Sequence, residues 1–307
     1  MDPRPPTLAW VSLDEAGRIV HDAPLTVLHR VWRQVDPGDR LRFLTEMLTP
    51  AERRAMCLGL DEEDEGSKNI IGNSLPKKDH PMLRCANVYI FDIETAHSAD
   101  ACLYCAGSPE CHAGETGKTH DYEPIGWNNP LALGLSIGCA FSYRRMSVEW
   151  FDTSALEQII TRWVAEQPLM VGFNSLRFDG PLLQAILRNR DESLYQLCDA
   201  FQDLMGRGYD ILDAVWSADP VRKFERGLNS LGAISVANGY GEKAMDGAMA
   251  PRLWRAGRIA EVLNYCAGDV EKTRRLFEQI VSTGNLLRGD GQPITLPRPA
   301  IPQEISG

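Results

Sequence analysis

Two acidic residues lie at the end of an apolar run in the first third of the chain. Residues 88–94 form this run and carry Asp92 and Glu94. In an extended strand, residues two apart point to the same face, so the two carboxylates project together. Carboxylate oxygens are the ligands that Mg²⁺ and Mn²⁺ prefer. The run therefore indicates a candidate site for divalent cations at the end of a strand.

Two later segments supply further acids. Asp179 follows an apolar run at 169–173 and opens a stretch with helical character. Asp269 lies four residues after Tyr265, within a segment, 259–280, whose apolar residues recur at helical spacing. Residues four apart share a helix face, so Tyr265 and Asp269 are expected to lie together. The apolar stripe of this helix comprises Val262, Leu263, Cys266, Val270, Leu276, Phe277 and Ile280.

These four acids would repel one another at a common point, and some would take up protons unless cations were present. Two divalent ions roughly 3.5–4 Å apart can hold the attacking and leaving oxygens of a phosphoryl displacement. The hydroxyl of Tyr265 could orient the attacking water without ionising. The residues therefore predict a two-metal phosphodiesterase. The alternative is that they are ordinary acids at strand ends and on helix surfaces.

The three segments resemble the motifs of 3′→5′ exonucleases of the DEDD superfamily, in the subfamily whose third motif carries a tyrosine. They also resemble the exonuclease domains of family B DNA polymerases. The histidine subfamily places its histidine five residues before the last aspartate, where this chain has Asn264. The resemblance covers residues 87–280. It implies an α/β, ribonuclease H-like fold, with a mixed sheet flanked by helices.

The resemblance also implies a role for each motif residue. Asp92 would bridge two Mg²⁺ or Mn²⁺ ions, and Glu94 and Asp269 would bind the ion that holds the attacking water. Asp179 would serve the second ion, and Tyr265 would position the water. The implied reaction is hydrolysis of the terminal phosphodiester bond of DNA or RNA, with single strands favoured. Three residues of the second motif are expected to contact the substrate: Asn174, Arg177 and Phe178.

Residues 97–127 form an insertion between the first motif and the next predicted strand. A Cys-x-x-Cys pair with a nearby cysteine and histidine has the ligand types of a structural Zn²⁺ site. A long loop with few apolar residues has little else to hold it, and metal binding can supply the folding energy. A mobile loop with free thiols and a disulfide are the alternatives. The candidate zinc ligands are Cys102, Cys105, Cys111, His112 and His120.

The chain divides into regions of different composition. Residues 1–60 have apolar residues at helical spacing and predict a small helical N-terminal region. Residues 61–82 combine an acidic run with glycines and prolines, which indicates a linker. We expect the exonuclease-like domain over 83–285 and an extended, proline-rich C-terminal tail over 286–307.

The predicted domain begins with strands in hairpin-like succession and continues with alternating helices and strands, which matches a mixed sheet flanked by helices. Strands are expected at 87–93, 131–141, 146–151, 169–173 and 209–211. Helices are expected near 154–166, 180–190, 192–205, 228–238 and 258–281. Two further acids, Asp210 and Asp213, are interpreted as capping or structural residues rather than catalytic ones.

The formal net charge of −10 is unusual for an enzyme that contacts phosphates. It argues against tight, non-specific duplex binding. It fits an enzyme that grips a few terminal nucleotides. The partner we expect is a nucleic acid with a free 3′ end, with DNA slightly favoured over RNA. The net charge also fits delivery by a protein partner that binds the N-terminal region or the tail.

No run of 18 apolar residues and no signal-peptide pattern occurs in the sequence, so we expect a cytoplasmic protein without membrane contact. A function of another class is also open. The chain could be a nucleic-acid-binding or adaptor protein built on an exonuclease-like scaffold. Such a protein would act through the N-terminal region and the cysteine-rich loop. The complete set of four acids favours the exonuclease, because a scaffold has no need of mutually repelling carboxylates.

Overall fold

The computed structural model of the chain describes residues 83, 86–101, 103, 123–225 and 227–302, all within the unit Leu75–Gly307. The expected helical region at 1–60 and the linker at 61–82 lie outside the described residues. The predicted zinc ligands also lie outside them: Cys102, Cys105, Cys111, His112 and His120.

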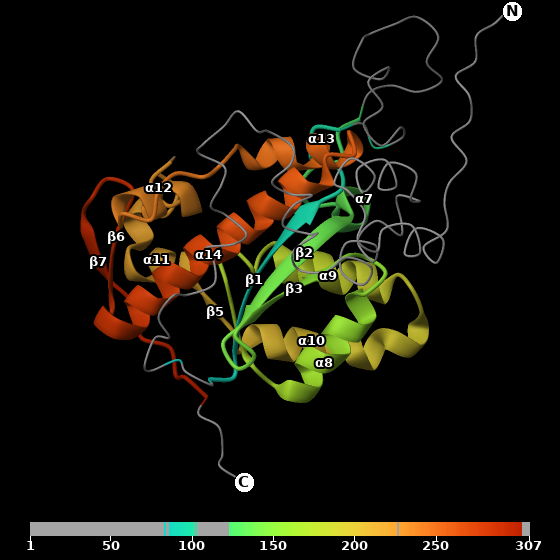
Figure 1. Cartoon of the computed structure of the whole chain (residues 1–307), viewed down its shortest axis with the longest axis horizontal. Helices are drawn as coiled ribbons and strands as arrows, with labels where there is room; N and C mark the ends of the chain where they lie inside the picture. Colours follow the sequence, from blue (N-terminus) through green and yellow to red (C-terminus); the bar gives the residue numbers. More distant parts are fainter. Residues whose placement is uncertain (1–82, 84–85, 102, 104–122, 226, 303–307) are drawn as a thin grey trace, which may run out of the picture. The chain divides into compact units, whose positions relative to one another are not determined.

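A five-stranded mixed sheet forms the centre of the described unit, in the order β3-β2-β1-β4-β5 (Figure 1). β1 (Val88–Thr95), β2 (Leu135–Ser142) and β3 (Ser147–Phe151) pair antiparallel. β4 (Leu169–Gly172) pairs parallel with β1, and β5 (Tyr209–Asp210) pairs parallel with β4. The predicted α/β architecture with a mixed sheet is therefore confirmed.

Four longer helices flank the sheet. α8 (Leu156–Glu166), α9 (Asp179–Arg188) and α10 (Tyr195–Gly206) pack against one another. α14 (Ile259–Thr283) runs across β1 and β2 (Figure 1). Every residue of the apolar stripe predicted for this last helix is buried.

The aromatic core lies between the sheet and the layer of α8, α9 and α10. The fully buried ring of Trp163 lies 5.5–6.4 Å, centroid to centroid, from the rings of four residues: Tyr89, Phe91, Phe151 and Phe201. Because Tyr89 and Phe91 are two apart on β1, they occupy one face of that strand. The opposite face of β1 is consequently the one that carries Asp92 and Glu94.

The remaining described elements are short. The α-helices are α7 (Pro130–Leu133), α11 (Ile211–Ala218), α12 (Leu231–Ala237) and α13 (Ala250–Arg255). The 3₁₀ helices are η2 (Glu192–Leu194), η3 (Pro220–Arg222) and η4 (Gly247–Met249). The strands are β6 (Asn285–Leu287) and β7 (Pro293–Thr295), which pair antiparallel.

The structure differs from the sequence prediction where capping residues start helices. A strand was expected from residue 131, but α7 occupies this position and β2 begins only at Leu135. The side chain of Asn129 accepts a hydrogen bond from the backbone of Ala132, and Pro130 takes the first helical position, which favours a helix start. Similarly, the expected strand at 209–211 ends at Asp210, which caps α11.

The first part of the expected C-terminal tail is a paired structure rather than a free extended segment. β6 and β7 form a two-stranded antiparallel sheet. Leu286 and Ile294 are opposite each other in this sheet, and both are buried. Burial of these two side chains explains why the segment folds back onto the domain.

Candidate metal centre

β1 presents its two acids next to an irregularity at its end. The pairing with β2 shifts register between Glu94 and Thr95, which marks a β-bulge. The hydroxyl of Ser136 donates a hydrogen bond to the Glu94 backbone oxygen at 2.9 Å and closes the strand end. Bulges often re-aim side chains next to functional sites. Here Glu94 is buried and Asp92 is half-buried.

α14 lies against this strand end and contributes Cys266, Tyr265 and Asp269, all of which are buried. The Cys266 Sγ atom lies 3.5 Å from the backbone oxygen of Asp92 and 3.8 Å from its Oδ2 atom. Ligand atoms of Asp92, Glu94 and Cys266 all lie within 4.8 Å of one another. This group could hold a metal ion.

Asp179 reaches the same strand from the first turn of α9. Its Oδ1 atom accepts a hydrogen bond from the backbone nitrogen of Ile93 at 3.2 Å. Because Ile93 lies between Asp92 and Glu94 in the sequence, this bond holds the Asp179 carboxylate beside the other two. The structure thus brings the acids of the first and second motifs together.

The loop that precedes α9 is held by Asp210. The Asp210 carboxylate accepts hydrogen bonds from the backbone nitrogens of Asn174 at 3.0 Å and Leu176 at 2.9 Å. It also accepts bonds from the nitrogens of Leu212 and Asp213 at the start of α11. Asn174 has a left-handed backbone conformation, with a φ of 67°. The capping role predicted for Asp210 is therefore confirmed, and the residue also fixes the loop that carries Asp179.

Burial and mutual repulsion raise the proton affinity of the acids. Burial raises the pKa of Asp92 well above its usual range, and the charges of Asp179, Glu94 and Asp269 raise it further. Burial and the charge of Asp269 likewise raise the pKa of Glu94. Burial raises the pKa of Asp179 to about 7, although its backbone hydrogen bonds act in the opposite direction. The four motif acids are thus close enough to influence one another.

Lys243 is a residue of the site that the sequence reasoning missed. Its Nζ atom donates hydrogen bonds to the Oδ2 atom of Asp269 and, at 3.0 Å, to the hydroxyl of Tyr265. Burial lowers the pKa of Lys243, but Asp269 and Tyr265 reverse this effect, so the pKa is raised and the ammonium stays charged. Lys243 lies in an irregular segment between α12 and η4, and no periodic pattern marks it.

The donor set fits divalent cations. The Oδ1 atom of Asp269 is buried and has no hydrogen-bond partner among the described residues, so it is a free acceptor. Burial raises the pKa of Cys266, which keeps the thiol protonated and able to donate to Asp92. Hard divalent ions would therefore be held by the carboxylates rather than by this sulfur.

Two of the expected substrate-binding residues lie within two positions of Asp179 in the sequence. Arg177 forms an ion pair with Asp213 at 2.9 Å, and its side chain is 54% exposed. Phe178 is half-buried, and its ring contacts the exposed Trp127 ring edge-on at a centroid distance of 5.7 Å. Both residues directly precede Asp179 and remain candidates for substrate contact.

Within the described part of the chain, no helix is both long enough and apolar enough to cross a membrane. The resemblance to DEDD exonucleases rests on the three motifs. No protein-family model matches the chain, and no curated protein or solved structure matches it either.

Proposed function

We propose that the chain is a metal-dependent 3′→5′ exonuclease that hydrolyses terminal phosphodiester bonds of DNA or RNA, with single strands favoured. The observation that carries the proposal is the meeting of Asp92, Glu94 and Asp179 with the Tyr265–Asp269 face of α14. The order of the mixed sheet is compatible with the ribonuclease H-like fold that the motifs imply. The 3′→5′ polarity comes from the motif resemblance.

Four carboxylates would hold the ions. Asp92 and Glu94 lie close enough to share one cation, and the free Oδ1 atom of Asp269 offers a further oxygen. Asp179, held by the backbone nitrogen of Ile93, would complete a second position. Two Mg²⁺ or Mn²⁺ ions bound there would supply an activated water and stabilisation of the leaving oxygen.

Tyr265 and Lys243 would act on the water and on the phosphate. Burial raises the pKa of Tyr265, so its hydroxyl keeps its proton and can orient a water by hydrogen bonding. The Lys243 ammonium is fixed by Tyr265 and Asp269. It would stabilise the negative charge that develops on the phosphate. The water oxygen loses a proton and bonds to phosphorus, and the bond from phosphorus to the 3′ oxygen of the preceding nucleotide breaks. That oxygen takes up a proton to give a 3′-hydroxyl, and a nucleoside 5′-monophosphate is released.

The direct test uses 5′-labelled single-stranded DNA, RNA and duplex DNA, each incubated with Mg²⁺, Mn²⁺ or EDTA. We expect a ladder that shortens from the 3′ end and requires the metal. Asp92→Ala should reduce the rate by about a thousandfold or more, because a bound cation contributes several kcal/mol to such a reaction. Asp203→Ala is the matched control, since Asp203 is an exposed acid on α10.

Hydrolysis by Asp92→Ala at the wild-type rate would contradict the proposal. Binding of a polymer without any hydrolysis by the wild type would favour the adaptor function instead.

A further inference from the structure

A short surface segment after α11 exposes two large apolar side chains. Val221 in η3 is 92% exposed, and Phe224 is 85% exposed. Scattered apolar side chains are common on protein surfaces, but neighbouring ones next to a site often mark a binding surface. Arg177, Trp216, Val221, Lys223 and Phe224 are called the aromatic patch below.

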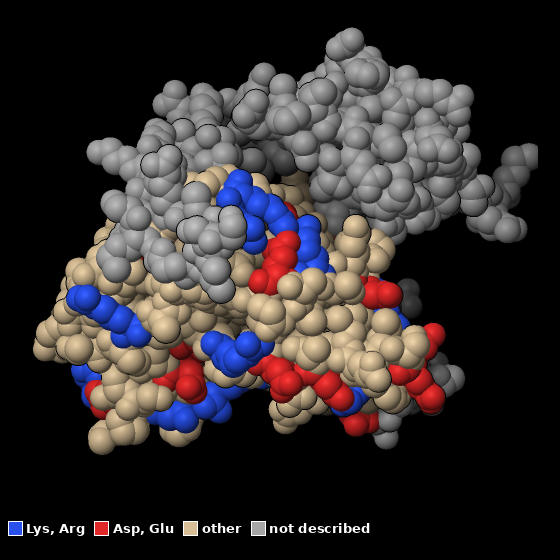
Figure 2. Space-filling model, turned by 90° about the horizontal axis from the view of Figure 1, so that it is seen from below, with Lys and Arg blue, Asp and Glu red and all other residues tan. Residues whose placement is uncertain are grey.

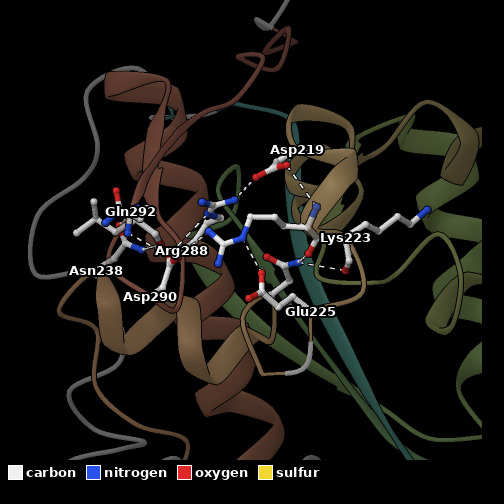
Figure 3. Close-up of polar contacts among 10 residues, drawn as sticks. Asp219, Lys223, Glu225, Asn238, Arg288, Asp290 and Gln292 are labelled. Atoms are coloured by element: carbon white, nitrogen blue, oxygen red, sulfur yellow. Dashed lines mark hydrogen bonds and ion pairs between the residues drawn. The ribbon is translucent and has the colours of Figure 1, made fainter.

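The segment that carries the patch is firmly anchored. Arg222 forms ion pairs with Glu225 at 2.6 Å and with Asp290 at 2.7 Å (Figure 3). Arg288 pairs with Asp219 at the other end of the segment. These contacts fix residues 219–225 to the turn between β6 and β7. Val221 and Phe224 are therefore exposed on a segment that ion pairs join to the rest of the domain.

A cation lies over both rings of the patch. The Nζ atom of Lys223 is 4.7 Å from the ring centroid of Trp216 and 5.2 Å from that of Phe224. The two rings are 6.1 Å apart and inclined at 51°. The Lys223 side chain points away from Glu225 and Asp290 (Figure 3). No carboxylate in the described part of the chain forms an ion pair with Lys223, so its charge is available to a ligand.

The patch includes a residue of the loop that carries the second-motif acid. The guanidinium of Arg177 lies 5.2 Å from the ring centroid of Trp216. Arg177 also belongs to the loop that ends at Asp179, two residues further on. Contacts therefore lead from Arg177, two residues before the second-motif acid in the sequence, through Trp216 to Phe224.

The overall charge of the chain offers no general attraction for a polyanion. The net charge is −10. On the face shown in Figure 2, groups of Lys and Arg alternate with groups of Asp and Glu instead of forming a continuous basic surface. A nucleic acid must therefore be held by local features, and stacking on aromatic rings combined with nearby cations is the usual one for single strands.

We propose that the aromatic patch binds the single strand that trails behind the nucleotide undergoing hydrolysis. A base stacks on Phe224, and Lys223 contacts a phosphate. This inference rests on the proposed function, because a strand trails behind the reacting nucleotide only if the chain is an exonuclease.

Binding can be tested without hydrolysis by placing the patch variants in the Asp92→Ala background. The probe is a fluorescent dT oligonucleotide of about 12 nucleotides, which spans a typical single-strand site. Phe224→Ala should raise its Kd about fivefold or more, and Phe224→Trp should restore binding because stacking is retained. Lys223→Ala should lower the slope of log Kd against log salt by about 0.7.

The matched control is Tyr195→Ala. Tyr195 is a half-exposed aromatic residue whose ring lies under the Arg188 guanidinium at 5.1 Å, so it reproduces the cation–aromatic pair. Arg188 ends α9, whereas Asp179 begins it, which places the control pair at the far end of that helix. Tyr195→Ala should leave the Kd unchanged.

Length dependence separates this inference from the proposed function. In the hydrolytically active background, Phe224→Ala should raise KM more for a long strand than for a dinucleotide, because a dinucleotide leaves little strand behind the reacting bond. If the wild type hydrolyses both substrates and Phe224→Ala changes neither KM nor Kd, the patch inference is overturned, and a protein becomes the better candidate for this surface. If the wild type hydrolyses neither, the proposed function fails, whatever the variants bind.

Discussion

High proton affinity distinguishes Asp92, Glu94 and Asp179 from ordinary surface acids. Burial is the largest cause in each case, and neighbouring carboxylates add to it for Asp92 and Glu94. Lys243 offsets part of this effect from its position beside Asp269. When these buried acids are deprotonated, their charges repel one another. Bound cations would relieve this repulsion.

The pH dependence of stability follows from these pKa values. An acid with a raised pKa in the folded state binds more protons when folded, so stability falls as the pH rises from the unfolded to the folded pKa. For Asp179 the window runs from about 4 to about 7. In EDTA, we expect the Tm to be lower at about pH 8 than at about pH 5, and Mg²⁺ should offset the loss because it binds the deprotonated acids.

Differential scanning calorimetry of the wild type and Asp179→Asn checks this prediction. The Asn variant keeps an oxygen that can accept from Ile93 but cannot titrate, so its Tm should depend less on pH. An equal pH dependence in both proteins would show that Asp179 does not titrate in this window.

Tyr265→Phe removes the hydroxyl beside Lys243 and keeps the buried ring. We expect kcat to fall about tenfold to a hundredfold with little change in KM, because a hydrogen bond to a charged group contributes about 1.5–3 kcal/mol. Single-turnover hydrolysis measures the effect. A rate equal to the wild type would exclude a role for the hydroxyl, and a loss as large as that of Asp92→Ala would require a more direct one.

Three elements position the site: the end of β1, the first turn of α9 and one face of α14. Groups on such regular elements are held more accurately than groups on loops. Asp179 would still be misplaced if the loop before α9 moved, and Asp210 prevents this by accepting four backbone hydrogen bonds. Asp210 therefore acts on the site through the loop.

Asp210→Ala should lower the free energy of unfolding by about 2–4 kcal/mol, because it leaves buried and partly buried backbone nitrogens without an acceptor. Hydrolysis should also fall, since the loop no longer holds Asp179. Asp210→Asn retains one acceptor oxygen and a good capping residue, so its loss should be smaller. Urea denaturation measures both variants, and equal stability of Asp210→Ala and the wild type would refute this role.

Local patterns explain which parts of the structure could be predicted. The spacing of apolar residues predicts the buried stripe of α14, and strand alternation predicts that Asp92 and Glu94 share a face. The approach of Lys243 to Asp269 follows from tertiary packing of an irregular segment, and no local signal encodes it. The contact of Cys266 with Asp92 likewise depends on how α14 crosses the sheet, which periodicity does not specify.

At the scale of the molecule, ion pairs engage several of the arginines in the described part of the chain. Arg145 pairs with Glu149 and Glu166, and the buried Arg274 pairs with Glu271 and Glu278. These arginines stabilise the fold, and their pairing reduces what is available for phosphates. An acidic protein of this kind would hold its substrate mainly at the metal centre and at the surface next to it.

Sulfur substitution at the scissile phosphate tests most directly whether cations held by the four carboxylates contact the reacting group. Each diastereomer of a 3′-terminal phosphorothioate DNA would be hydrolysed under single-turnover conditions in Mg²⁺ and in Mn²⁺. Because Mn²⁺ accepts sulfur more readily than Mg²⁺, we predict that one diastereomer reacts more than about tenfold slower in Mg²⁺ and recovers in Mn²⁺. Hydrolysis of both diastereomers at the unsubstituted rate in Mg²⁺, or in EDTA, would contradict the two-metal account.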